Sequence, residues 1–259
     1  MNKVAVAEFT NYKESVKDAL DKIDAAKILG EQEKIIIKPN LVSCGEPPVT
    51  TDVNHVKAII SYIKKCSKAK IYVADGSGGC DTDKAFKNLG YDSVEPDATL
   101  VDIDKEESII KLSKDLPLLK EVFLPSFLMD GFLISAPSLK QHTITKVTLG
   151  IKNMIGILPR KHYQGYWVFR KSKIHKYNIH QAIADVACYR KTDLTIIDGA
   201  IGLSKGHLFG KPFNPPKKKT IAGFDPLETD CVGAEMLGYK PMEVKHLRCY
   251  KSNLKKAGL

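Results

Sequence analysis

KIIIKPN, at residues 34–40, is a short apolar run that is typical of a strand buried on both faces of a parallel sheet. Apolar residues at helical spacing follow over 52–67, and KIYVAD at 70–75 then repeats the strand pattern. A strand and a helix precede this unit over 3–29, and a short helix follows it over 82–90. The alternation predicts an α/β fold: an open, mostly parallel, Rossmann-like sheet with helices on both faces.

The C-terminal half continues the alternation less regularly. Strands are predicted at 131–137, 193–199 and 218–224, helices at 145–157, 178–191 and 226–238, and loops at 138–144 and 158–176. This second βα set either extends the first sheet or forms a second lobe. We therefore expect one domain over 1–259, with two lobes at about 1–137 and 138–259 as the alternative.

The composition is that of a globular protein rather than a disordered chain. Of the 259 residues, 43% are hydrophobic and 27% are charged. No apolar run approaches the roughly 20 residues of a membrane helix, and the N-terminus predicts a strand rather than a signal peptide. We therefore expect a cytoplasmic protein with no membrane contact. The net charge of +10 favours an anionic partner, although a lysine-rich surface would give the same balance.

The six cysteines form no C-x-x-C pair, which excludes a zinc ribbon or a ferredoxin-type run within this chain. A disulfide is not expected in a cytoplasmic protein. Cys44 and Cys80 each follow a predicted strand, and Cys231 lies in the last predicted helix. These three thiolates are candidate ligands for a divalent metal or an iron–sulfur cluster, but buried free cysteines are the commoner explanation.

Polar residues follow several of the predicted strands. They are Lys38 and Asn40, then Asp75 and Ser77, then Asp198 and Asp225. Ligands of open α/β sheets bind at the carboxyl ends of the strands, so these side chains are candidates for a binding site. Aspartate and glycine also follow strands simply because they form turns. The glycine loop at 76–79 is either a phosphate cradle or a tight turn, and it matches no known nucleotide-binding motif.

The segment SLKQHTITKVTLGIKNMIG at 138–156 holds the most informative set of polar residues. Lys140 and Lys152 are candidates for holding an anion, and His142 can act as an acid or base near neutral pH. The alternative is that Lys152 is an ordinary surface lysine.

A basic and aromatic segment follows at 159–176. It contains Arg160, Lys161, Tyr163, Tyr166, Trp167, Phe169, Arg170, Lys171, Lys173 and Lys176 and no acidic residue. This composition suits single-stranded nucleic acid, and it also suits a lid over an anionic substrate. A solvated loop with its aromatic residues packed on the core is the third interpretation.

The motifs KPNLVS (38–43), VADGSGG (73–79), SLKQHTITKVTLGIKNMIG (138–156) and AGFDPLETDCVGAEMLGY (222–239) occur in this order. With them the chain resembles the uncharacterised family called "domain of unknown function 362" over nearly its whole length. The matching polar positions are Lys38, Asn40, Thr51, Asp75, Lys140, His142, Lys152, Asn153, Asp198, Asp225 and Asp230. Many members of that family carry a ferredoxin-type domain, so the resemblance implies an association with iron–sulfur proteins. This chain has no such domain, and Cys44 and Cys80 lie outside the family pattern.

The leading hypothesis is an enzyme that acts on a small anionic substrate. Lys140 and Lys152 would hold its carboxylate or phosphate, and His142 would transfer a proton. Asp198, Asp225 and Asp230 would orient these groups or bind a cation. The chemistry would be redox, with electrons from a separate ferredoxin-type protein.

Two other functions fit the sequence. One is nucleic-acid binding through residues 159–176. The other is a non-catalytic carrier of a metal or cluster held by Cys44, Cys80 and Cys231.

Overall fold

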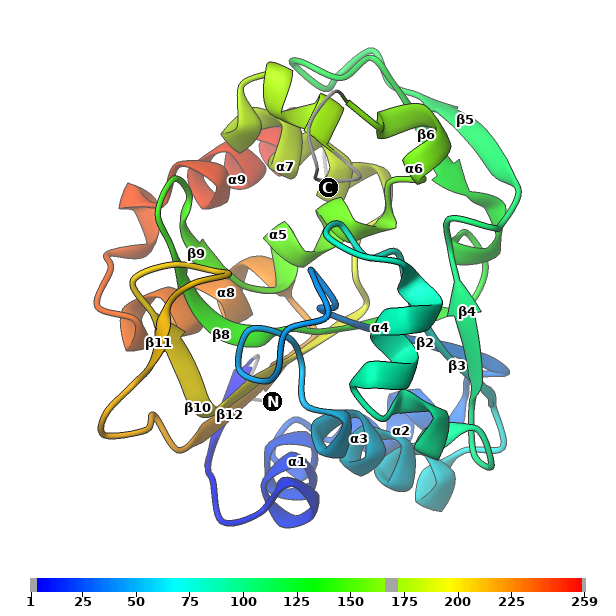
Figure 1. Cartoon of the computed structure of the whole chain (residues 1–259), viewed down its shortest axis with the longest axis vertical. Helices are drawn as coiled ribbons and strands as arrows, with labels where there is room; N and C mark the ends of the chain where they lie inside the picture. The colour runs from blue at the N-terminus through cyan, green and yellow to red at the C-terminus, as the bar shows by residue number, and fades with distance from the viewer. Residues whose placement is uncertain (1–3, 166–171, 258–259) are drawn as a thin grey trace.

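The structure is a computed structural model that describes residues 4–165 and 172–257 (Figure 1). Within this described part, ten strands form one sheet whose main path runs β1-β12-β10-β7-β2-β3-β4. These strands are β1 Val4–Glu8, β2 Lys34–Pro39, β3 Lys70–Asp75, β4 Thr99–Asp102, β7 Phe132–Ala136, β10 Leu194–Ser204 and β12 Lys219–Gly223. Three strands lie off this path: β8 Ser138–His142, β9 Lys146–Thr148 and β11 Lys211–Pro212.

The sheet is parallel from β10 through β7, β2 and β3 to β4, as the sequence predicts. Ile35 lies between Phe132 of β7 and Ile71 of β3, which places the isoleucine run at the centre of the parallel part. The other edge is antiparallel, because β12 pairs antiparallel with both β10 and β1. The α/β fold is therefore confirmed, with an antiparallel edge that the sequence pattern did not reveal.

Helices cover both faces of the sheet (Figure 1). One face carries α1 Tyr12–Asp21, α2 Ala25–Gly30, α3 Val53–Cys66 and α4 Thr82–Asn88. The other face carries α5 Gly150–Asn153, α6 Arg160–Tyr163, α7 Ile179–Tyr189, α8 Pro226–Met236 and α9 Lys245–Ala257. Side chains alternate between the two cores, because Ile35 and Ile37 face α3 whereas Ile36 faces the opposite way. None of the described helices combines the length and the apolar character that crossing a membrane requires.

Short elements complete the described chain. A separate hairpin consists of β5 Ser108–Leu112 and β6 Glu121–Pro125. The 3₁₀ turns are η1 Tyr91–Val94, η2 Ser126–Leu128, η3 Met154–Ile157, η4 Ser172–Lys176 and η5 Pro241–Glu243. Strands from both predicted lobes belong to the one sheet: β1 lies beside β12, and β7 lies between β2 and β10.

Several predicted elements have different limits in the structure. The helix predicted over 12–29 is interrupted between α1 and α2, where Asp24 adopts a left-handed backbone with φ 54°. The loop predicted at 138–144 contains β8, and the helix predicted over 145–157 is divided among β9, α5 and η3. The loop predicted at 158–176 contains α6 and η4. Apolar spacing failed in these segments because they are short and bury polar side chains.

Candidate active site

A cavity of about 610 Å³ lies where β2 and β3 end, beside β8 and α5. The structure brings seven of the predicted site residues into its wall: Lys38, Asn40, Asp75, Lys140, His142, Lys152 and Asn153. They come from four segments far apart in the sequence. Parallel strands bring these residues together because their carboxyl ends meet at one edge of the sheet.

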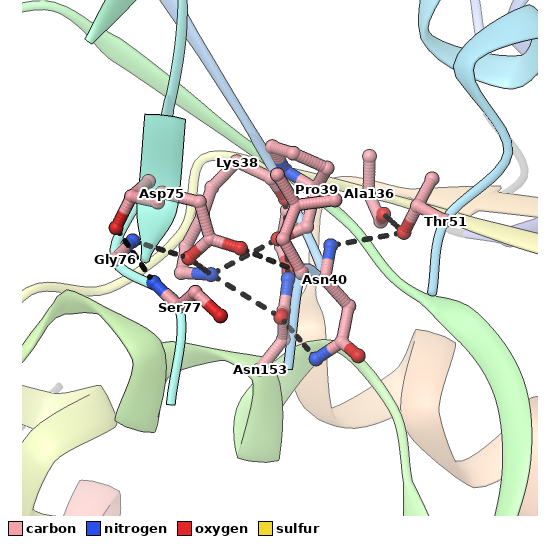
Figure 2. A network of polar contacts seen from close by, with 12 residues as sticks. Lys38, Pro39, Asn40, Thr51, Asp75, Gly76, Ser77, Ala136 and Asn153 are labelled. Carbon is pink, nitrogen blue, oxygen red and sulfur yellow. Dashed lines mark hydrogen bonds and ion pairs between the residues drawn. The ribbon is translucent and has the colours of Figure 1, made fainter. Parts of the chain in front are cut away.

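A buried ion pair between Lys38 and Asp75, drawn in Figure 2, belongs to the lining of this cavity. Lys38 Nζ lies 2.6 Å from Asp75 Oδ1, and both side chains are 2% exposed. Asp75 also accepts hydrogen bonds from the backbone N–H groups of Leu41 (2.7 Å) and Gly76 (2.8 Å). A Cβ added to Gly156 would lie 2.6 Å from Lys38 Nζ, so no larger residue fits against this pair. Asp75 is the one carboxylate among the described lining residues, and Lys38 already neutralises it.

Two asparagine side chains connect this ion pair to a second lysine, Lys140. Figure 2 shows the part of this network formed by Lys38, Asn153 and Asn40. Asn153 Nδ2 donates to the Lys38 carbonyl (3.1 Å) and to Ser135 Oγ (3.0 Å). Its Oδ1 therefore faces Asn40 Nδ2 at 3.0 Å, which leaves Asn40 Oδ1 to accept from Lys140 Nζ at 2.6 Å. The amides thus fix one another's orientation and the position of both ammonium groups.

Thr51 and Ser77 support this arrangement without lining the cavity. Thr51 Oγ1 accepts from the backbone N–H of Asn40 (2.9 Å) and donates to the carbonyl of Ala136 (2.7 Å). The backbone N–H of Ser77 donates to Thr82 Oγ1 (3.2 Å), and that of Gly76 is bound to Asp75. Because the glycine loop uses these two amides internally, they do not form a phosphate cradle.

Lys140 is fully buried and forms no ion pair with any carboxylate among residues 4–165 and 172–257. Its Nζ donates to two neutral oxygens, Asn40 Oδ1 and the carbonyl of Val49 (2.7 Å). In its ammonium form the group has three donors, so one is left without an acceptor in the described part of the chain. Burial, with the positive charge of Lys152 as a second cause, holds the pKa of Lys140 well below its usual range.

His142 lines the cavity, and its hydrogen bonds to the backbone determine which ring nitrogen carries the proton. Its Nδ1 accepts from the backbone N–H groups of Ile144 (3.0 Å) and Thr145 (3.3 Å), so the neutral ring carries its proton on Nε2. Its ring stacks on His207 with centroids 3.9 Å apart. Burial and the nearby lysines lower the pKa of His142 far below its usual value and that of His207 to about 3. Both rings are therefore neutral at physiological pH.

Lys152 is half-buried in the cavity wall. In the described part of the chain, it makes no hydrogen bond or ion pair. Burial lowers the pKa of Lys152 to about 8. Its helix, α5, is anchored by Asp230, which accepts from the backbone N–H groups of Gly150 and Ile151, each at 2.8 Å. Lys152 is thus a rigidly mounted, partly desolvated amine.

The predicted aspartates other than Asp75 lie outside the cavity wall. Asp198 accepts from Tyr12 Oη (3.3 Å) and from the backbone N–H of Ala200 (3.0 Å). Asp225 caps the N-terminus of α8. Asp230 is fully buried beneath α5, and burial raises its pKa to about 7. Only Asp230 has a direct connection to the cavity, through the helix that carries Lys152.

Cys44 and Cys80 form a disulfide, with Cα atoms 6.2 Å apart, and this corrects the expectation of free thiols. The bond joins the loops that follow β2 and β3, both of which line the cavity. Cys231 instead packs at the edge of the core on the α8 face, where burial raises its pKa to about 11. Among residues 4–165 and 172–257, no three histidine, cysteine or acidic side chains are grouped to hold a metal. The described residues therefore do not fit an intrinsic iron–sulfur cluster.

The basic aromatic segment contributes to the cavity rim through Gly165, His175 and Lys176. Tyr163 is buried in the core, where its hydroxyl accepts from the backbone N–H of Phe123 (3.0 Å). Arg160 starts α6, and its backbone N–H donates to Asp104 (2.8 Å). Five residues of the predicted surface lie outside the described ranges: Tyr166, Trp167, Phe169, Arg170 and Lys171.

Sequence reasoning missed His207, which lies in the connection between β10 and β11. The segment around it is rich in glycine and lysine, which predicts only a surface loop. Its place in the cavity depends on how that hairpin folds back over β8, and no local pattern signals this.

These features define an α/β protein with a basic cavity at its strand ends. The family model described as "Domain of unknown function (DUF362)" matches residues 35–235, and the chain belongs to this family.

No curated protein matches the chain. Among solved structures, a DUF89 family protein from Pyrococcus horikoshii is 14% identical over 49% of this chain, with a TM-score of 0.28. The matched region is 42% of that protein's length, less than half of it.

Proposed function

We propose that this protein is an enzyme that binds a small anionic substrate in the cavity. The observation that carries the proposal is Lys140, a fully buried lysine that has no ion-pair partner among the described residues and whose ammonium form keeps one donor without a described acceptor. A buried ammonium group is costly unless a counter-charge compensates it. Lys38 has such a counter-charge in Asp75, so an anion from solution is the natural partner of Lys140.

The neighbouring residues suggest how such a substrate is held. Lys140 and Lys152 supply positive charge on one cavity wall, and the remaining Lys140 donor binds a carboxylate or phosphate oxygen. His142 donates from Nε2 to a second oxygen on the substrate. A neutral imidazole in this position stabilises negative charge that develops on that oxygen during reaction. The supported chemistry is therefore acid–base catalysis at a carbon that bears oxygen.

The redox role, with an external iron–sulfur electron donor, stays a prediction. Nucleic-acid binding also stays a prediction, and burial of Tyr163 leaves one fewer aromatic ring for base stacking. The carrier function has no ligand set among the described cysteines, because Cys44 and Cys80 are bonded to each other.

Calorimetry with pyruvate, oxaloacetate and inorganic phosphate tests the proposal. We expect at least one of these anions to bind, and Lys140→Met to weaken binding by about 10- to 100-fold, because a hydrogen bond to a charged group contributes roughly 1.5–3 kcal/mol. Lys191→Met, which removes an exposed lysine outside the cavity wall, is the matched control. Unchanged affinity in a folded Lys140→Met protein, or no binding of any of the three anions, would show that the proposal is wrong.

A further inference from the structure

We propose that Lys152 is a nucleophile that forms an imine with a carbonyl group of the bound anion, so that the substrates are oxo acids. This inference rests on the proposed anion site and adds a covalent step and a substrate class to it.

The backbone around Lys152 is fixed on both sides. Asp230 holds the N-terminal amides of α5, and the next residue, Asn153, is hydrogen-bonded to the Lys38 carbonyl and to Ser135. The Lys152 side chain therefore leaves a rigid support and enters the cavity wall. A reactive amine needs such positioning, because the reacting atoms must meet in a narrow range of geometries.

Lys152 differs from the other two lysines of the cavity wall in its bonding. Lys38 donates to three oxygens, one of them the carboxylate of Asp75, and Lys140 donates to two. Lys152 has no such acceptor among the described residues. A lysine that serves only as a fixed charge is expected to be hydrogen-bonded as they are. A partly desolvated amine without such acceptors is instead the arrangement that activates lysine as a nucleophile.

The pKa of about 8 supports this interpretation, because about a tenth of such an amine is neutral at pH 7, far more than for an ordinary lysine. The neutral form has the free electron pair that attack on a carbonyl carbon requires.

The other cavity groups match the remaining parts of an oxo acid. Lys140 provides a donor for the carboxylate, and His142 Nε2–H provides one for the carbonyl oxygen. All three side chains line the same cavity. A hydroxy acid would occupy the carboxylate site equally well, but it offers no carbon that an amine can attack.

In the proposed step, the electron pair of Lys152 Nζ forms a bond to the carbonyl carbon, and the carbonyl π pair moves to the oxygen. A proton passes from nitrogen to that oxygen, giving a carbinolamine. The carbon–oxygen bond then breaks, and the oxygen leaves as water with both hydrogens of the original amine. A carbon–nitrogen double bond replaces the carbon–oxygen double bond, and nothing is oxidised or reduced.

Borohydride trapping of the full-length protein tests this step, with pyruvate and oxaloacetate as probes. Borohydride delivers hydride to the imine carbon and leaves a stable secondary amine. We expect intact-mass analysis to show a single adduct with at least one probe, and peptide mapping to place it on Lys152. Lys152→Met should abolish the adduct, whereas Lys191→Met should retain it. Lactate and malate, the hydroxy counterparts, should bind without being trapped.

The outcomes separate this inference from the anion site. If the oxo acids bind by calorimetry but borohydride leaves no adduct, or an adduct on another lysine, the imine is wrong and the anion site stands. If phosphate binds but none of the four acids does, the imine is wrong and the anion site stands, and if neither phosphate nor any of the four acids binds, both are wrong. Chemical denaturation shows whether Lys152→Met is folded, and in a folded variant the loss of the adduct is assigned to the missing amine.

Discussion

Asp230 positions the helix of the candidate nucleophile through its two oxygens, each bound to one backbone N–H of α5. Asp230→Ala leaves both buried donors without a partner, at roughly 1–3 kcal/mol each. We therefore expect a loss of about 2–5 kcal/mol in the free energy of unfolding, measured by chemical denaturation, together with weaker anion binding.

Asp225→Ala is the matched control for that experiment. Asp225 caps α8 and does not contact α5, so its loss should cost about 0.5–2 kcal/mol and leave anion affinity unchanged. Equal effects of both substitutions on anion affinity would contradict a specific positioning role for Asp230.

The titration of Lys152 should also change how the free energy of unfolding depends on pH. Its pKa is about 8 in the folded protein, whereas an unfolded lysine titrates near its ordinary value of about 10.4. Between these values the unfolded chain binds more protons, so stability rises with pH across this window. Because Lys140 titrates in both proteins, the difference in the free energy of unfolding between the wild type and Lys152→Met, measured by denaturation from pH 7 to 11, should grow with pH across this window. Parallel curves would mean that burial does not depress this pKa.

At the scale of elements, the disulfide joins two loops of the cavity wall. The loops are also in direct contact, because a Cβ on Gly79 would lie 2.9 Å from the carbonyl oxygen of Val42. The bond closes a loop with a sequence separation of 36, and such cross-links typically contribute 2–4 kcal/mol. We expect a thiol reductant to lower the denaturation midpoint of the wild type and to weaken its anion binding.

The double variant Cys44→Ser with Cys80→Ser should behave like the reduced wild type and ignore the reductant. Cys66→Ser, which removes a free thiol near the end of α3, serves as the control. A reductant that shifts the double variant as much as the wild type would show that the effect does not come from this disulfide.

The strand β8 shows why hydrophobic patterning misses some elements of a functional site. Within SLKQH, the buried positions include Lys140 and His142, and Leu139 is the only aliphatic residue. A method that equates burial with apolar character therefore predicts a polar loop. The strand is held by its pairing with β9 and β10. β10 is distant in the sequence, and the register of its pairing with β8 is irregular.

For the whole molecule, the α/β alternation and the convergence of strand-end residues were predictable, because both follow from local periodicity and the geometry of parallel sheets. This reasoning placed Lys38, Asn40 and Asp75 at one edge correctly. The partner of Cys44 and the stacking of His207 on His142 depend on how loops fold over that edge. No short-range pattern encodes such contacts.

The cavity lining includes Leu41 from one hydrophobic core and Ile155, which packs against the other, so ligand binding should stabilise both cores together. A ligand that binds only the folded state adds about 2.7 kcal/mol at 100 times its dissociation constant. Pyruvate, or oxaloacetate if only that acid binds, should therefore raise the thermal midpoint of the wild type in a concentration-dependent way. Lys140→Met should show a smaller shift at the same ligand concentration, and an equal shift in that variant would place the binding elsewhere.

Position 156 in the cavity wall has no space for a side chain larger than that of glycine. Its neighbour, the Lys38–Asp75 pair, leaves no room for even a methyl group. A saturation library at position 156, sorted for folded and anion-binding protein, should retain glycine alone. At Gly78, where an added Cβ would be 3.7 Å from its nearest neighbour, the same selection should also accept alanine and serine. Redesign of the substrate range should therefore keep Gly156, Lys38 and Asp75 and change other residues that line the cavity.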